Sequence, residues 1–69
     1  MDRVSEKILE DVKKLKIPLS TLGKFVHLSK SSITLRLQGK RKWKIPELRE
    51  LSRVFGHDPN YYEGFLNLQ

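Results

Sequence analysis

Residues 18–37, PLSTLGKFVHLSKSSITLRL, have the pattern of two short helices joined by a tight turn. Pro18 suits the start of the first helix, because the backbone N–H that proline lacks would be unpaired there. Leu22 and Val26 lie four residues apart, so they share one face of that helix and are expected to be buried. The first helix is therefore predicted to end near Val26.

The second helix of the pair is predicted over residues 30 to about 38, with Ser29 as the N-cap that accepts a backbone N–H. Ile33 and Leu37 are the apolar pair at four-residue spacing, and we expect them to point inward. The outer face that remains is small, polar and basic, and it consists of Lys30, Ser31, Thr34 and Leu35. Any amphipathic surface helix would look similar, so this face alone does not establish a function.

The run over residues 22–56, LGKFVHLSKSSITLRLQGKRKWKIPELRELSRVFG, resembles the helix-turn-helix domain of the lambda-repressor-like (Cro/C1, or XRE) family, in the small form of phage repressors. The positions that match this family are, in order, Leu22 with a small residue after it, Val26, Leu28 and Ser29, Ile33, Gly39 and Lys40, and the apolar helix 45–55. The resemblance extends over residues 18–59. It implies an all-α, compact bundle of about five short helices that binds DNA.

Three positions depart from that family's pattern. His27 stands where the turn usually has a glycine, and a non-glycine residue at positive φ is uncommon. Gly23 stands where alanine is frequent; it keeps a close helix approach but lowers helix propensity by about 1 kcal/mol. Leu19 replaces a glutamine that commonly meets a phosphate, so that contact is expected to pass to Ser20 or Thr21.

The length and composition restrict the classes of protein. A chain of 69 residues forms one domain, residues 1–69, whose core is too small for a buried multi-residue active site. The absence of cysteine excludes disulfides and thiolate metal sites. The apolar runs are far shorter than a membrane span or a signal-peptide core. We therefore expect a soluble, cytoplasmic protein.

The positive charge is concentrated in one segment. The net charge is +6, and residues 30–44 contain six Lys or Arg and no acidic residue, whereas residues 1–29 carry +2 and residues 45–69 carry −2. The excess therefore lies in the second helix of the pair and the loop after it, where a phosphate backbone would be met. A solvated charge run is the alternative, and its position beside a helix-turn-helix pattern favours phosphate.

Three more helices are predicted around this pair. Residues 2 to about 16 form an amphipathic helix whose apolar stripe is Val4, Ile8, Val12 and Leu15. Residues 46–55 form another, ended by Gly56, whose buried stripe is Leu48, Leu51, Val54 and Phe55. A short last helix, about residues 58–66, would begin with Asp58 as its cap and Pro59 at its first position.

Aromatic residues leave two alternatives open. Trp43, in the loop that follows Gly39, could stack on a base or pack on the core, and core packing is favoured. The last helix is too apolar for a free tail, so it either seals the core or contacts a second subunit. The residues of this candidate dimer interface are Tyr61, Tyr62, Phe65 and Leu66.

Signals for catalysis are weak. His27 and His57 have no neighbours at metal-ligand spacing, and His57 beside Asp58 is interpreted as part of a turn and cap. No glycine-rich phosphate loop and no Ser/His/Asp set is recognisable. We therefore expect no enzyme activity, no metal or other cofactor, and no small-molecule effector.

The functional hypothesis is sequence-specific binding to double-stranded DNA, with the helix at about residues 30–38 in the major groove. Base contacts are assigned to Lys30, Ser31, Thr34 and Leu35. Phosphate contacts are assigned to Ser20, Thr21, Arg36, Gln38, Lys40, Arg41, Lys42 and Lys44. The resemblance implies a phage-type repressor or Cro-like transcription regulator that acts as a homodimer on an operator in the nucleoid of a bacterium or phage-infected cell.

Two alternatives to this hypothesis remain. The same fold could serve as a protein-binding module that modulates another repressor or acts as an antitoxin-like partner. Non-specific nucleic-acid binding would use the same charge without base readout.

Overall fold

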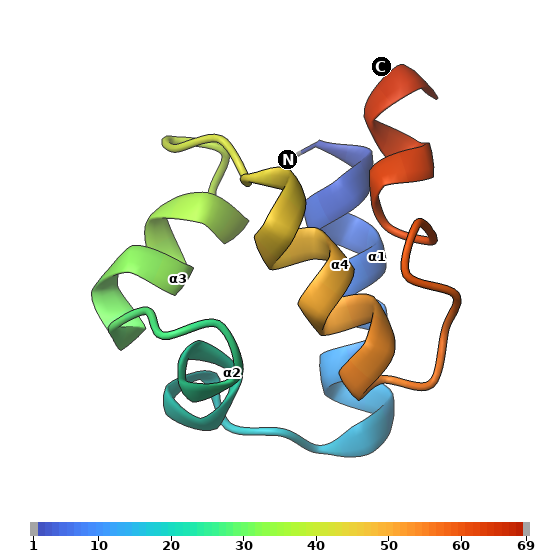
Figure 1. Cartoon of the computed structure of the whole chain (residues 1–69). Helices are drawn as coiled ribbons and strands as arrows, with labels where there is room; N and C mark the ends of the chain where they lie inside the picture. Colours follow the sequence, from blue (N-terminus) through green and yellow to red (C-terminus); the bar gives the residue numbers. More distant parts are fainter. Residues whose placement is uncertain (1, 69) are drawn as a thin grey trace.

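Helices are the only regular secondary structure over residues 2–68, which are the residues that this computed structural model describes. In that range the chain has four α-helices, a terminal 3-10 helix and no strand. Figure 1 shows how these elements are arranged. The elements are α1 (Arg3–Leu15), α2 (Leu19–Phe25), α3 (Lys30–Leu37), α4 (Ile45–Val54) and η1 (Glu63–Leu68). The prediction of an all-α fold is confirmed, although the fifth element is a 3-10 helix and not an α-helix.

The α1 helix is capped at both ends. Asp2 accepts the backbone N–H of Ser5 at 2.7 Å, and Lys16 ends the helix in the left-handed region with φ 55°. The predicted stripe is buried at its first three positions, but Leu15 is 52% exposed. The prediction for Leu15 is therefore wrong, because it lies in the last turn, where the chain turns away from the core at Lys16.

The α2 and α3 helices are joined by residues 26–29, in which His27 has φ 59° as the turn requires. Ser29 caps α3, since its side chain accepts the N–H of Ser32 at 3.1 Å. The carbonyl of Gly23 accepts the N–H of Leu28 at 2.8 Å. A Cβ added to Gly23 would collide with the Leu28 carbonyl oxygen, so glycine permits this close approach.

The core lies between all five elements and consists of Val4, Ile8, Val12, Leu22, Ile33, Leu37, Trp43, Leu48, Leu51 and Tyr62. Ile33 and Leu37 are buried as predicted, whereas Val26, at the end of α2, is only half-buried. Core packing of Trp43 is confirmed: the residue is 7% exposed, and its indole N–H donates to Ser5 Oγ at 3.1 Å.

The α4 helix buries Leu48 and Leu51 as predicted, while Val54 in its last turn is 38% exposed and corrects the predicted stripe. Gly56 ends this region at φ 83°. Residues 59–62 then form turns, and η1 begins only at Glu63, so the prediction of a helix from residue 58 is wrong. The turns and η1 carry the chain back along α1 (Figure 1).

The described residues form one compact body. The radius of gyration of the Cα atoms is 10.7 Å, close to the roughly 11 Å expected for a single domain of this length. Within residues 2–68 no helix is long and apolar enough to span a bilayer.

Candidate nucleic-acid interface

The outer face of α3 lies opposite the residues that this helix buries. Lys30 and Ser31 are exposed, and Thr34 and Leu35 are half-exposed. These four side chains line one shallow, open groove on the surface. The structure therefore brings together the four residues to which base contacts were assigned.

The hydroxyl groups near this face differ in their hydrogen bonding. Thr34 Oγ1 donates to the backbone carbonyl of Lys30 at 2.9 Å. Ser29 and Ser32 are paired with each other, with their Oγ atoms 3.2 Å apart, and they form the cap of the helix. The hydroxyls expected to contact bases are those of Ser31 and Thr34, and the Thr34 hydroxyl already donates its proton within the helix.

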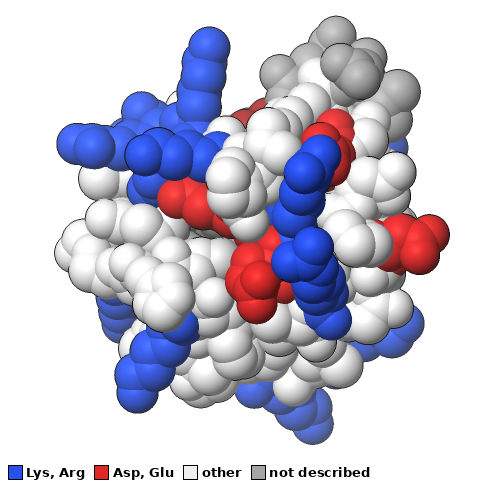
Figure 2. All heavy atoms as spheres, viewed as in Figure 1, with Lys and Arg blue, Asp and Glu red and all other residues white. Residues whose placement is uncertain are grey.

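The loop after α3 carries the exposed cations. It leaves the helix through Gly39 at φ 78°, and the side chains that it exposes are Lys40, Arg41, Lys42 and Lys44. Gln38 is exposed as well. Figure 2 shows Lys and Arg side chains gathered over this connection between α3 and α4. The positive charge therefore lies directly beside the outer face of α3.

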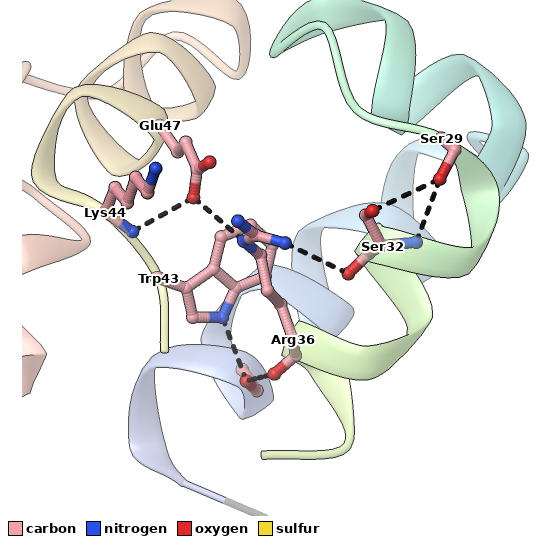
Figure 3. A network of polar contacts seen from close by, with 7 residues as sticks. Ser29, Ser32, Arg36, Trp43, Lys44 and Glu47 are labelled. Atoms are coloured by element: carbon pink, nitrogen blue, oxygen red, sulfur yellow. Dashed lines mark hydrogen bonds and ion pairs between the residues drawn. The ribbon is translucent and has the colours of Figure 1, made fainter. Parts of the chain in front are cut away.

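Arg36 is a correction to the predicted phosphate contacts. Only 8% of the residue is exposed, and its Nε lies 3.0 Å from Glu47 Oε1. Its Nη1 also donates to the carbonyl of Ser32 at 3.4 Å (Figure 3). Position 36 follows Ile33 by three residues, so both side chains point to the same face of α3. The guanidinium consequently holds α3 against α4 and is not free for phosphate.

The same network fixes the end of the basic loop. Glu47 Oε1 accepts the backbone N–H of Lys44 at 2.9 Å, and Ser5 Oγ donates to the carbonyl of Arg36 at 3.1 Å. Trp43 enters this network through its indole N–H (Figure 3). Because buried, mutually satisfied polar groups rigidify their surroundings, the loop has a defined position relative to α3.

The start of α2 presents the remaining predicted phosphate contacts. Ser20 is exposed and Thr21 is half-buried, both in the first turn of the helix. This exposure suits Ser20 better than Thr21 for a contact with a ligand.

The C-terminal aromatic residues do not form one exposed surface. Tyr62 is completely buried, so its assignment to a dimer interface is wrong. Tyr61 and Leu66 are each 36% exposed, and Phe65 is half-buried beneath Lys7, whose Nζ lies 5.5 Å from the ring centroid. Tyr62 therefore seals the core, whereas Tyr61 and Leu66 remain accessible on the surface.

Sequence reasoning missed a polar cluster that attaches this segment to α1. Asp11 Oδ2 accepts the hydroxyl of Tyr62 and lies 2.9 Å from His57 Nε2, and the His57 ring stacks on Tyr61 with centroids 3.9 Å apart. Burial, and then the hydrogen bond to Asp11, raise the pKa of Tyr62 above its ordinary value. Within residues 2–68 no group of three His, Cys, Asp or Glu residues could hold a metal ion. The only signal in the sequence was an apolar tail with a histidine before it.

Comparisons with known proteins add no further information on this interface. No protein-family model matches the chain, and searches of curated proteins and of solved structures gave no significant match. We therefore infer the function from the outer face of α3 and the exposed cations of the loop that follows it.

Proposed function

We propose that this chain binds double-stranded DNA sequence-specifically, with α2, residues 26–29 and α3 acting as a helix-turn-helix and α3 entering the major groove. The observation that carries the proposal is the placement of an acid-free, small polar face on α3 beside a loop with four exposed cations. The network of Arg36, Glu47 and Trp43 holds that loop in place. The proposed role is that of a transcription regulator of the phage-repressor or Cro-like type.

Base contacts follow from the groups on the outer face of α3. The ammonium of Lys30 donates to guanine O6 or N7, and the hydroxyl of Ser31 donates to a neighbouring base edge or phosphate. The half-exposed Leu35 contacts the methyl group of a thymine. Contacts of this kind give sequence preference, whereas contacts to phosphate do not.

Phosphate contacts come from the basic loop and its surroundings. The proposed set is Ser20, Thr21, Gln38, Lys40, Arg41, Lys42 and Lys44, and it omits Arg36 because of its burial. If four cations of one protomer neutralise phosphates, the slope of log affinity against log salt is about −3.6. Affinity would then fall about 150-fold between roughly 50 and 200 mM salt.

A homodimer on a two-fold operator is part of the proposal, because one small domain covers little DNA surface. Because Tyr62 is buried, we leave it out of the candidate interface, which then consists of Tyr61, Phe65 and Leu66. Sedimentation velocity at high protein concentration, with and without operator DNA, tests this part. Sedimentation as a monomer under both conditions would remove the dimer from the proposal.

Selection of bound sequences from a random duplex pool, at low and at near-physiological salt, tests the function as a whole. The expected result is a two-fold motif with half-sites about one helical turn apart. Parallel selections separate the two kinds of contact: Leu35→Ala is expected to change the motif at one position per half-site, and Lys42→Ala is expected to keep the motif at lower yield. Failure to enrich any motif, with binding lost as salt rises, would contradict sequence-specific recognition and favour non-specific binding or a protein partner.

A further inference from the structure

The outer face of α3 is more apolar in the structure than its residue types indicate. A threonine hydroxyl has a single proton, and that of Thr34 is donated to the Lys30 carbonyl at 2.9 Å. What Thr34 still offers a ligand is its γ-methyl group and an oxygen that can accept. Thr34 is half-exposed and lines the open groove on the outer face of α3, so its side chain is accessible to a bound surface.

Leu35 lies beside Thr34 on the same groove. The two residues together present an aliphatic side chain and a methyl group. On one side of these groups along α3 are the donors Lys30 and Ser31, and on the other side is the basic loop. A surface with this composition fits a base pair that shows an apolar group in the major groove. Thymine is the base that does so, through its C5-methyl group.

We infer that Thr34 is a specificity-determining residue that reads thymine through its methyl group, together with Leu35, and does not read a base through its hydroxyl. This inference rests on the proposed function and deepens it, because it adds Thr34 to the thymine contact of Leu35 and names the group of Thr34 that makes the contact. Contact of aliphatic groups with the thymine methyl removes apolar surface from water and favours thymine over cytosine, which has no such methyl.

The inference also positions the thymine within a half-site. Thr34 lies four residues after Lys30, which is about 6 Å along the helix, and stacked base pairs are about 3.4 Å apart. The thymine is therefore expected one or two base pairs from the guanine that Lys30 contacts. The selected motif should contain guanine and thymine at this spacing in each half-site.

A matched pair of variants separates the methyl group from the hydroxyl. Thr34→Val keeps the branched shape and a γ-methyl group but removes the hydroxyl, while Thr34→Ser keeps the hydroxyl and removes the methyl. We expect Thr34→Val to bind the selected duplex within about twofold of the parent, and Thr34→Ser to bind about fourfold more weakly, as for the loss of one buried methyl group. Urea denaturation of both variants establishes that each is folded under the binding conditions.

Substitution in the DNA provides the complementary measurement. Deoxyuridine in place of one thymine removes only the C5-methyl group and retains base pairing. At the contacted thymine, this change is expected to weaken the parent about fourfold and to have a smaller effect on Thr34→Ser, which has already lost its part of the contact.

The outcomes distinguish this inference from the function on which it rests. A motif whose affinity is insensitive to deoxyuridine at every thymine would overturn the inference and leave sequence-specific binding intact. So would a loss of affinity in Thr34→Val with retention in Thr34→Ser, since the hydroxyl would then be the group that reads the base. A pool that yields no motif would overturn the proposed function and this inference together.

Discussion

Replacing Glu47 by glutamine measures how strongly the buried ion pair holds α3 against α4. Glu47 Oε1 lies 3.0 Å from Arg36 Nε and accepts the N–H of Lys44 at 2.9 Å. The side chains of Arg36 and Glu47 are only 10% and 12% exposed. Glutamine has nearly the same volume as glutamate, so the substitution removes a charge without opening a cavity. It leaves the guanidinium of Arg36 buried without its counter-charge.

The expected cost follows from this burial. Removing one partner of a buried ion pair destabilises a protein by about 3–5 kcal/mol, and the residual exposure of both side chains places this pair near the lower end, at about 3 kcal/mol. A domain of this length has a total free energy of unfolding of roughly 3–10 kcal/mol. The variant should therefore lose a large part of its stability, with a decrease in Tm of about 12–24 °C.

Urea denaturation followed by the fluorescence of Trp43 measures the effect, because Trp43 is the single tryptophan and lies in the core. The matched control is Glu50→Gln on the same helix, whose partner Arg53 lies at 3.7 Å with both side chains exposed. This control is expected to lose less than about 0.5 kcal/mol. Equal losses in the two variants would refute the argument that burial sets the cost.

A double variant connects this pair to DNA binding. Arg36→Met combined with Glu47→Leu removes both buried charges and is expected to recover much of the stability lost in the single variant. Since Arg36 is not among the proposed phosphate contacts, the salt dependence of DNA affinity should equal that of the parent. A slope smaller by about 0.9 for each bound protomer would show that Arg36 does reach a phosphate.

Three further predictions concern the basic loop, the turn and the buried tyrosine. Lys42→Ala should weaken binding to all duplexes alike and reduce the slope of log affinity against log salt by about 0.9 for each bound protomer. Lys13 is exposed on α1, and Lys13→Ala should change neither the affinity nor the slope in a fluorescence-anisotropy salt titration. Gly23→Ala should lower the free energy of unfolding by about 1–3 kcal/mol, because its Cβ would collide with a backbone carbonyl. The control Gly64→Ala, whose Cβ meets nothing within 4 Å, should change the free energy of unfolding little. Equal losses of stability in the two variants, measured by calorimetry, would contradict this account of the turn. Burial and hydrogen bonding raise the pKa of Tyr62 above 10.0. The contribution of Tyr62 to the free energy of unfolding is therefore complete below pH 10.0. It is lost progressively above that pH, because the unfolded chain releases a proton that the native chain retains. The free energy of unfolding, measured by urea denaturation from about pH 9 to about pH 11, should fall by up to about 1.4 kcal/mol per pH unit above the unfolded pKa because of this group. The free energy of unfolding of Tyr62→Phe should fall less steeply than that of the parent.

Local pattern was sufficient for the four α-helices and for their ends, but not for the last element. Ile33 and Leu37 are buried because residues four apart share a helical face, and that relation is present in the sequence before any packing is known. Ser29 caps α3, and Gly39 and Gly56 have positive φ, because these residue types satisfy the local backbone requirements at helix ends. The four residues on the outer face of α3 were found by the same periodicity.

The exposed or buried state of single residues was less predictable. Leu15 and Val54 follow the apolar periodicity of their helices but are exposed, because each lies in a last turn that no other element covers completely. Tyr62 is buried although Tyr61 and Leu66 are exposed, because residues 59–62 form turns and not the helix that the sequence predicts. Periodicity indicates which face of a helix is apolar, but it does not indicate how far the neighbouring elements extend over that face.

The amino-acid sequence was enough to establish the all-helical class, the pair of helices around His27 and the concentration of positive charge in residues 30–44. Packing decided which of those charges remain available to a ligand. Arg36 meets Glu47 across 11 residues of sequence, and Asp11 meets His57 and Tyr62 across 46 and 51 residues. Such pairs form only when helices distant in the chain are brought together in a low-dielectric interior, and no local spacing encodes them. The hydrogen bond from the Thr34 hydroxyl to the Lys30 carbonyl is local, but a threonine in a helix has two favourable rotamers, so the sequence alone does not determine where this hydroxyl donates.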